Sequence, residues 1–525
     1  MGKKSFISYL KSVSPENSNK PSSYAKAMEV IEETFFSKAL VDTTDVWNFI
    51  TLENIDGLYE VVVREQKNEN GIFKGYKSPS YWKDGFCSAA LKEYKHFLEK
   101  SRLSTQPSNK IEQTSLIPTD SIFLPKPFLL LAGISGTGKT RFVREQAKAS
   151  SDQHKYGITE GENHCLVPVR PDWHEPSDLL GYISRIGSGG TRYVTTDLLR
   201  FIVAAWKHAA ESVSATQITR KPLDTICPFW LCLDEMNLAP VEQYFADYLS
   251  ILETRKWDGE AYSCDPLLKP AVIQQQLEEA GRKDLWDNLG IAGDDPLSAG
   301  LRDYFAANGI PLPPNLIVAG TVNMDETTHG FSRKVIDRAL TIDFGEFFPN
   351  DYDQYYEDDK KTAVKPLSFP RLSKINNAAD LAAVAADPDG RTTIAFLTAV
   401  NGVLSGTPFV LAFRALNEAL LSVACFSPAD PAHLQAVWDD YLMMKVLPRI
   451  EGDAEKLGSQ DDASLLTRLS DLLKVQLSVI SAGRLDLLNH SSADGTAVKT
   501  TCRSLKKLAW MQKRLDANGF TTFWP

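Results

Sequence analysis

The segment that decides the fold reads Gly133-Ile134-Ser135-Gly136-Thr137-Gly138-Lys139-Thr140. It matches the pattern G-x-x-x-x-G-K-[ST], a loop whose backbone N–H groups surround a phosphate at the start of a helix. The pattern requires a strand before the loop and a helix after it. Residues 128–132 form a short apolar run, and Phe142, Val143 and Ala147 form the apolar face of a helix. The sequence therefore predicts a phosphate-binding loop between a buried strand and a helix.

The positions of this loop have separate expected roles. Glycines let the backbone curl around the β-phosphate, so the expected cradle consists of Gly133, Ser135, Gly136, Thr137 and Gly138. Lys139 is expected to neutralise charge on the β- and γ-phosphates, and the Thr140 hydroxyl to ligate Mg²⁺. The alternative is a glycine-rich turn without a ligand, which the flanking strand and helix disfavour.

A second motif ends another apolar strand, in which residues 230–233 run into Asp234 and Glu235. Asp234 is expected to hold Mg²⁺ through water, and Glu235 to orient and polarise the attacking water. Strands that end in Asp-Glu are common, so the position of the motif matters. It follows the phosphate loop and precedes a helical stretch with the inward-facing residues Val241, Tyr244, Phe245, Tyr248 and Leu252.

A third strand, residues 317–322, ends in Asn323. We expect this strand to lie between the two nucleotide motifs in the sheet. Asn323 would then hydrogen-bond the γ-phosphate or the lytic water. The alternative is that Asn323 only caps the following turn.

Three arginines are candidates for reaching nucleotide phosphate. Arg333 and Arg338 are expected on one helix at a spacing of five residues, so that they point in different directions. One of them, preferentially Arg338, is expected to reach a neighbouring subunit's γ-phosphate, unless both are only solvated. Arg414 lies on a helix with an apolar face and is expected to contact nucleotide from a helical lid. A snorkelling arginine at the edge of the core is the alternative for Arg414.

The order of apolar runs and helical stretches predicts an α/β fold with a parallel sheet flanked by helices. Residues 1–104 are read as a small helical module with a possible role in target or partner recognition, and residues 105–126 as a linker. Residues 127–349 are expected to form the large α/β subdomain, with an inserted excursion at about 258–312. Residues 350–525 are expected to form a helical lid and C-terminal region.

Composition limits the classes of function. The net charge is −10, and residues 1–126 carry 17 Lys and Arg against 16 Asp and Glu, so the remainder is markedly acidic. A surface that grips nucleic acid everywhere is therefore excluded. No stretch is apolar enough to span a bilayer, and we expect a cytoplasmic protein without a membrane partner. The 7 cysteines include no C-x-x-C pair, so neither a disulfide framework nor a zinc site is expected.

These motifs together resemble the AAA+ P-loop NTPase superfamily, and more narrowly the McrB-like motors of modification-dependent, type IV-like restriction systems. The resemblance covers roughly residues 127–525. It rests on Asp234-Glu235-Met236-Asn237, Gly320-Thr321-Val322-Asn323-Met324-Asp325-Glu326-Thr327-Thr328, Phe413-Arg414-Ala415-Leu416-Asn417-Glu418, Lys445-Val446-Leu447-Pro448-Arg449-Ile450 and Gly519-Phe520-Thr521-Thr522-Phe523-Trp524. The last two have no mechanistic meaning that the sequence alone supplies.

The resemblance implies a hexameric ring, Mg²⁺-dependent hydrolysis of ATP or GTP at subunit interfaces, and a separate McrC-like nuclease subunit. DNA would be bound directly or through that partner in antiviral defence. The sequence departs from the family at Glu326, which fills a position where the best-known members, which use GTP, have Asp; we therefore expect ATP to be preferred. The alternatives are a MoxR-type remodelling chaperone that acts on protein partners, and a non-catalytic nucleotide-gated scaffold.

Overall fold

The computed structural model describes residues 6, 9–10, 20–37, 55–68, 73, 85–105, 121–151, 153–184, 192–259, 261–279, 282–324, 331–348, 365–458, 463–489 and 498–524. The chain divides into two compact units, Met1–Gln113 and Thr114–Pro525. The boundary between them falls inside the polar stretch 105–126, of which residues 106–120 lie outside the described residues.

The described part of the first unit is helical. It contains α2 (Lys20–Ser37), α4 (Ile55–Gln66) and α6 (Phe86–Thr105). Met28 and Ile31 of α2 and Leu91 and Tyr94 of α6 are buried in one apolar cluster. These residues recur at helical spacing, so each helix buries one face against the other.

The second unit is built on a five-stranded parallel sheet, which confirms the predicted α/β class. The strand order is β14 (Leu340–Asp343), β2 (Phe128–Gly133), β13 (Leu316–Asn323), β8 (Phe229–Asp234) and β3 (His164–Pro168). β13 lies between β2 and β8, as the sequence predicts. Because all five strands are parallel, the residues that follow β2, β8 and β13 meet at one edge of the sheet.

Both faces of this sheet are covered, because its central strands are apolar on both sides. Leu129 and Leu131 of β2 point into one cluster with α7 (Lys139–Ser150), whereas Phe128 and Leu130 point into the other. The second cluster includes buried residues of α10 (Asp197–Ala209), α11 (Val241–Tyr244), α12 (Ala246–Leu252) and α15 (Pro296–Asn308).

Short elements connect these layers. Between the phosphate loop and β8 they are α8 (Gln153–Tyr156), α9 (Pro176–Leu180), β4 (Gly181–Ser184), β5 (Arg192–Thr195), β6 (Ala210–Val213), β7 (Ile218–Arg220) and η1 (Leu223–Thr225). η2 (Met236–Leu238) follows β8. The region 258–312 contains β10 (Ala261–Ser263), β11 (Pro266–Leu268), α13 (Pro270–Glu279), α14 (Arg282–Asn288), α15 and β12 (Ile310–Pro311), and β9 (Lys256–Asp258) enters it.

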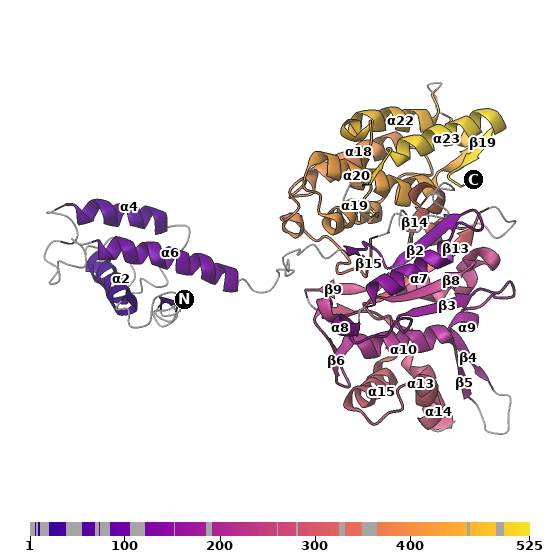
Figure 1. Ribbon diagram of the computed structural model, residues 1–525, viewed down its shortest axis with the longest axis horizontal. Helices are drawn as coiled ribbons and strands as arrows, with labels where there is room; N and C mark the ends of the chain where they lie inside the picture. Colours follow the sequence, from indigo (N-terminus) through magenta and orange to yellow (C-terminus); the bar gives the residue numbers. More distant parts are fainter. Residues whose placement is uncertain are drawn as a thin grey trace. The chain divides into compact units, whose positions relative to one another are not determined.

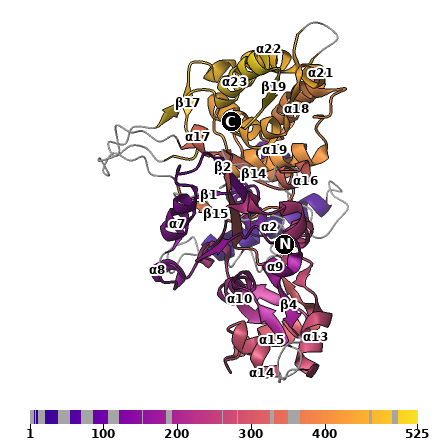
Figure 2. The same cartoon turned by 90° about the vertical axis from the view of Figure 1, so that its right-hand side faces the viewer.

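The C-terminal third is a helical lid on the α/β layers. Its elements are η5 (Ala378–Leu381), α18 (Arg391–Leu404), α19 (Phe413–Phe426), α20 (Pro431–Tyr441), η6 (Leu442–Val446), η7 (Leu447–Arg449), β16 (Glu451–Asp453), α21 (Ala454–Leu457), α22 (Leu465–Gln476), η8 (Ser478–Ile480), β17 (Arg484–Leu485), β18 (Lys499–Thr500), α23 (Arg503–Asn518) and β19 (Phe520–Thr522). Within this unit the lid lies at one end and α13–α15 at the other in both views (Figures 1 and 2).

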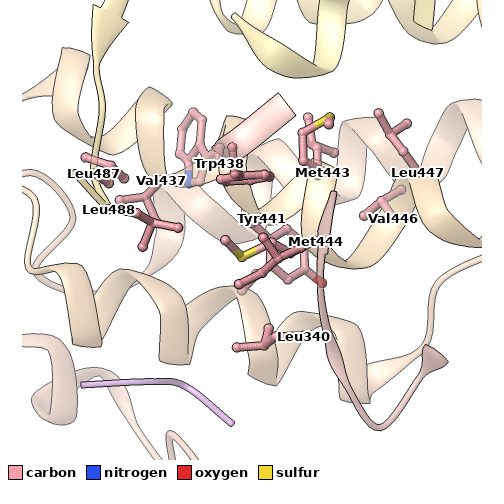
Figure 3. Packing of buried hydrophobic residues seen from close by; sticks show 14 of the residues in the cluster. Leu340, Val437, Trp438, Tyr441, Met443, Met444, Val446, Leu447, Leu487 and Leu488 are labelled. Atoms are coloured by element: carbon pink, nitrogen blue, oxygen red, sulfur yellow. The ribbon is translucent and has the colours of Figure 1, made fainter. Parts of the chain in front are cut away.

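The lid and the sheet share a continuous apolar core. Leu340 of β14 is packed with Tyr441 and Met444 in the same cluster (Figure 3). A second connection pairs β1 (Ile122–Phe123) in parallel with β15 (Leu367–Ser368), so the segment entering the sheet also contacts the start of the lid.

The placement of two arginines differs from the sequence-based expectation. Arg333 and Arg338 do not share a helix, because α16 (Arg333–Ile336) is one turn long and Arg338 follows it. The carbonyl groups of Ile336, Asp337 and Ala339, in the turn that follows this helix, accept hydrogen bonds from the Lys445 side chain. In the described part of the chain, no helix is long and apolar enough to cross a membrane.

Candidate functional site

The phosphate loop connects β2 to α7 in a conformation that requires glycine. Gly136 and Gly138 have φ of 81° and 87°, in the left-handed region that other residues rarely adopt. Gly133 is needed for another reason, because a Cβ there would lie 3.3 Å from the Cβ of Phe344. The N-cap residue of α7 is Gly138, which has no side chain that could cap the helix. The first N–H groups of this helix therefore face the loop, where an anion is favoured.

Lys139 lies inside the loop that it follows. Its side chain is buried, with 5% of the residue exposed. The ammonium group donates to the carbonyl oxygens of Gly133 at 3.1 Å and Ile134 at 2.7 Å, and to the hydroxyl of Thr137 at 3.4 Å. These contacts place a positive charge within the curl of the loop. Ser135, in the same loop, is exposed.

Asp234, at the end of β8, is the point where three elements meet. Its Oδ1 accepts from the hydroxyl of Thr140 on α7 at 2.6 Å and from the hydroxyl of Thr321 on β13 at 2.7 Å. The two residues expected to share a Mg²⁺ ion, Thr140 and Asp234, are thus in direct contact. A hydroxyl and a carboxylate oxygen are ligands of the kind that Mg²⁺ prefers.

Glu235 has an unusual backbone conformation. Its φ of 52° puts a non-glycine residue in the left-handed region, and the side chain is exposed. Asn323 Nδ2 donates to Glu235 Oε1 at 3.3 Å, and the Thr321 hydroxyl accepts from Glu235 N at 2.9 Å. Asn237 donates to the carbonyl of Asn323 at 3.0 Å. Strained backbone of this kind is concentrated at functional sites, and here it directs a carboxylate past the end of the sheet.

The residues at this edge fit a magnesium nucleotide. The loop supplies N–H groups and Lys139 for phosphate, Thr140 and Asp234 supply oxygen ligands, and Glu235 with Asn323 lies beside them. Among the described residues no group of three or more His, Cys, Asp or Glu side chains could hold a metal. A metal at this edge would therefore depend on phosphate and water oxygens for most of its ligands, as is usual for Mg²⁺.

Arg338 lies at the opposite ends of the strands, where the parallel strands begin, whereas the phosphate loop lies where they end. It precedes β14, whose Leu340 pairs with Leu129 near the start of β2, whereas the phosphate loop follows the end of β2. At about 3.3 Å per strand residue, the two edges are roughly 15 Å apart. Arg338 Nε lies 3.5 Å from Glu253 Oε1.

Arg414 shares this partner, because its Nη2 donates to Glu253 Oε2 at 2.6 Å. Arg414 therefore lies beside Arg338 and not at the phosphate loop of its own chain. The two arginines border a pocket of about 140 Å³ that is also lined by Lys126, Glu253, Arg255 and Asn417. Arg333 is engaged elsewhere: its Nη1 donates to the carbonyl of Pro408 at 2.9 Å.

Sequence reasoning did not assign roles to Thr321 and Glu253. Thr321 contacts both Asp234 and Glu235. Side chains alternate along a strand, so residue 321 lies on the same face as Asn323, and this spacing could have identified Thr321 from the sequence. Glu253 is distant in sequence from both arginines and carried no such signal. Residues 325–330, including Glu326, lie outside the described residues.

The comparisons with known proteins add one match. Residues 370–520, which make up most of the lid, match a family described as a domain of unknown function, DUF8727. No curated protein matches the chain.

Proposed function

We propose that this chain is an AAA+ nucleoside triphosphatase that hydrolyses ATP in preference to GTP, with Mg²⁺, at sites shared between subunits of a ring. The observation that carries the proposal is the convergence at one sheet edge of Lys139, Thr140, Asp234, Glu235 and Asn323, each with a contact that suits its role. The sheet order, with β13 between β2 and β8, supports the same conclusion.

The residues divide the work of phosphoryl transfer between them. The loop N–H groups and Lys139 bind the β- and γ-phosphates and stabilise charge that develops on them. Glu235 accepts a hydrogen bond from the attacking water, while Asn323 holds the Glu235 carboxylate in place. Water oxygen bonds to the γ-phosphorus as the bond to the bridging oxygen breaks, the nucleoside diphosphate leaves, and the proton that the water loses passes through Glu235 to solvent. Thr140, and Asp234 through water, would hold Mg²⁺, which would neutralise charge on the leaving diphosphate.

Arg338 and Arg414 act on the nucleotide of a neighbouring subunit in this proposal. They lie together at the edge of the sheet opposite to their own phosphate loop, and Glu253 holds both. A head-to-tail ring would bring this edge of one chain to the phosphate loop of the next. The γ-phosphate would then compete with Glu253 for the two guanidinium groups. We infer a ring from this head-to-tail contact. The number of six subunits is what the resemblance to McrB-like motors implies.

We further propose that the ring drives a DNA-directed, McrC-like nuclease carried by a separate partner subunit, in antiviral restriction. This step rests on the resemblance of residues 127–525 to McrB-like motors. Residues 1–104 would contribute recognition of the target or partner, because they lie in a unit with its own apolar core and lack the acidic bias of the remainder.

Hydrolysis by the purified full chain tests the core of the proposal. We expect Mg²⁺-dependent release of phosphate from ATP, with weaker use of GTP in competition assays. Lys139→Ala should abolish hydrolysis. Lys148→Ala, which changes an exposed lysine of the same helix, should leave it intact. Hydrolysis at the wild-type rate by Lys139→Ala would exclude this site, and use of GTP alone would exclude the preference for ATP.

A further inference from the structure

The turn that carries Arg338 is held by a lysine of the lid. Lys445 Nζ donates to the carbonyl oxygens of Ile336 at 3.3 Å, Asp337 at 2.9 Å and Ala339 at 2.7 Å. One ammonium group thus contacts the backbone on both sides of Arg338. Lys445 and this turn are more than 100 positions apart in the sequence. The sequence alone therefore gives no mechanistic meaning to the motif Lys445-Val446-Leu447-Pro448-Arg449-Ile450.

Further charges surround this contact. Glu418 of α19 is 2% exposed and forms ion pairs with Lys445, at 2.9 Å, and with Lys126. Lys126 Nζ also donates to the carbonyl of Asp337 at 3.0 Å. The Asp337 carboxylate lies 3.1 Å from Arg449 Nε. Both lid motifs, 413–418 and 445–450, therefore converge on the turn between α16 and β14.

The backbone around Lys445 is built for this contact. η6 (Leu442–Val446) is a π-helical turn at the end of α20, a feature that occurs frequently at functional sites. Met444 packs toward Leu340 on the sheet side (Figure 3). Within this π-helical turn, Met444 is buried against the sheet, and the neighbouring Lys445 side chain reaches the carbonyl groups.

Stability alone does not explain a buried lysine here. Removing an ammonium group from water is costly, and well-packed apolar residues often replace buried ion pairs without loss of stability. Burial, together with the nearby Lys126 charge, lowers the pKa of Lys445 to about 8, although Glu418 opposes the shift. What the charge contacts is one turn, through the three carbonyl groups of residues 336, 337 and 339.

We propose that Lys445, held by Glu418 and Lys126, is a positioning residue that fixes the 336–339 turn and thereby presents Arg338 to the nucleotide of the neighbouring subunit. The inference rests on the proposed shared site. Its consequence is that the lid of one subunit controls hydrolysis in the next. A shift of the lid would move Lys445, and with it the 336–339 turn and Arg338. It also gives a role to part of the matched domain of unknown function.

Lys445→Met is the test variant, since it keeps the length of the side chain and removes the charge. A misplaced catalytic group costs about 10²-fold in rate, so we expect kcat for ATP to fall by about that factor while the affinity for a fluorescent ATP analogue stays within about twofold. Lys474→Met, at an exposed lid lysine, is the matched control and should behave as wild type.

Mixing subunits separates positioning from damage to the fold. Lys445→Met chains keep an intact phosphate loop and Glu235, so mixing them with Glu235→Gln chains should restore part of the activity. Mixing them with Arg338→Ala chains should restore none, because every interface then lacks a correctly placed arginine. If Lys445→Met is fully active, or fails to recover with Glu235→Gln although its subunits exchange, the inference is wrong. If instead Arg338→Ala is fully active, the shared site itself is wrong.

The pH profile gives an independent readout. The charged groups that face Lys445 are Lys126, Glu418 and Asp337. The folded pKa of Lys445 lies below the ordinary value of 10.5, so its loss of a proton above pH 8 does not destabilise the fold. We expect kcat to decline as pH rises through about 8. Lys445→Arg should remain active and keep its rate at higher pH, because arginine stays charged. An identical alkaline decline in Lys445→Arg would contradict the assignment.

Discussion

Thr321 shows how much of the site depends on one hydroxyl group. It donates to the carboxylate of Asp234 and accepts from the backbone N–H of Glu235, so it fixes both acidic residues at the end of β8. Replacing it with valine keeps the shape of the side chain and removes both hydrogen bonds. Loss of such a supporting contact at a metal site typically costs about 10- to 100-fold in activity, and we expect that reduction in kcat.

Thr341→Val is the matched control for this prediction. Thr341 is a buried threonine on the same sheet, in β14, and its hydroxyl has no hydrogen-bond partner among the residues that the structure describes. Valine there should leave hydrolysis unchanged and should not lower stability. Equal activity of Thr321→Val and Thr341→Val would show that the hydroxyl of Thr321 does not support the site.

Single residues also show which part of the candidate site's geometry could be predicted from the sequence. Lys139, Thr140, Asp234 and Glu235 belong to local patterns whose chemistry depends on neighbours in the chain, so their positions at one sheet edge follow from strand order. Glu253 and Lys445 act through contacts with residues far away in the sequence, and nothing local distinguishes them from other charged residues. Only the packed structure brings them to Arg338.

At the scale of elements, a buried ion network holds the lid together. Asp440 of α20 pairs with Arg484 of β17 and with Arg503 of α23, and all three side chains are almost fully buried. Asp440→Asn would remove the carboxylate that the two guanidinium groups share, and would leave Arg484 with Asp439 and Arg503 with Asp486. Leaving a buried charge with no partner costs about 3–5 kcal/mol. Because each arginine keeps one carboxylate, we expect a smaller loss, which urea unfolding should show as a lower midpoint.

The control for Asp440 is the same substitution on the lid surface. Asp471 pairs with Lys474 at 2.8 Å, but both side chains are 63% exposed. Exposed pairs contribute under about 1 kcal/mol, so Asp471→Asn should hardly move the midpoint. Similar midpoints for the two variants would show that the buried network does not stabilise the lid.

Elements also show why the fold was only partly predictable. β2, β8 and β13 are fully or nearly fully buried, and their continuous apolar runs identify them. β3 is an edge strand with a half-exposed sequence, and β14 is four residues long. Neither has a pattern that separates it from a loop. The residues around Arg333 and Arg338 predict one helix, whereas α16 ends after one turn, and the backbone after it contacts a lid lysine more than 100 residues away in the sequence.

At the scale of the whole molecule, we propose that one chain contributes to two different shared sites. The phosphate loop and Glu235 lie at one edge of the sheet, and Arg338 with Arg414 lies at the other. A single subunit cannot join them, since the sheet separates them. Hydrolysis should therefore depend on assembly, and an arginine supplied in trans contributes about 10³- to 10⁵-fold in rate.

Mixing Arg338→Ala with Glu235→Gln tests this claim most directly. Each variant alone should be nearly inactive while still binding nucleotide. In a mixed ring, random pairing joins an intact Glu235 site to an intact Arg338 at about one interface in four, so activity should recover toward about a quarter of the wild-type rate. If the mixture stays inactive, although fluorescence energy transfer between labelled subunits shows that they exchange, the two halves do not form one site and the account of a shared active site is contradicted.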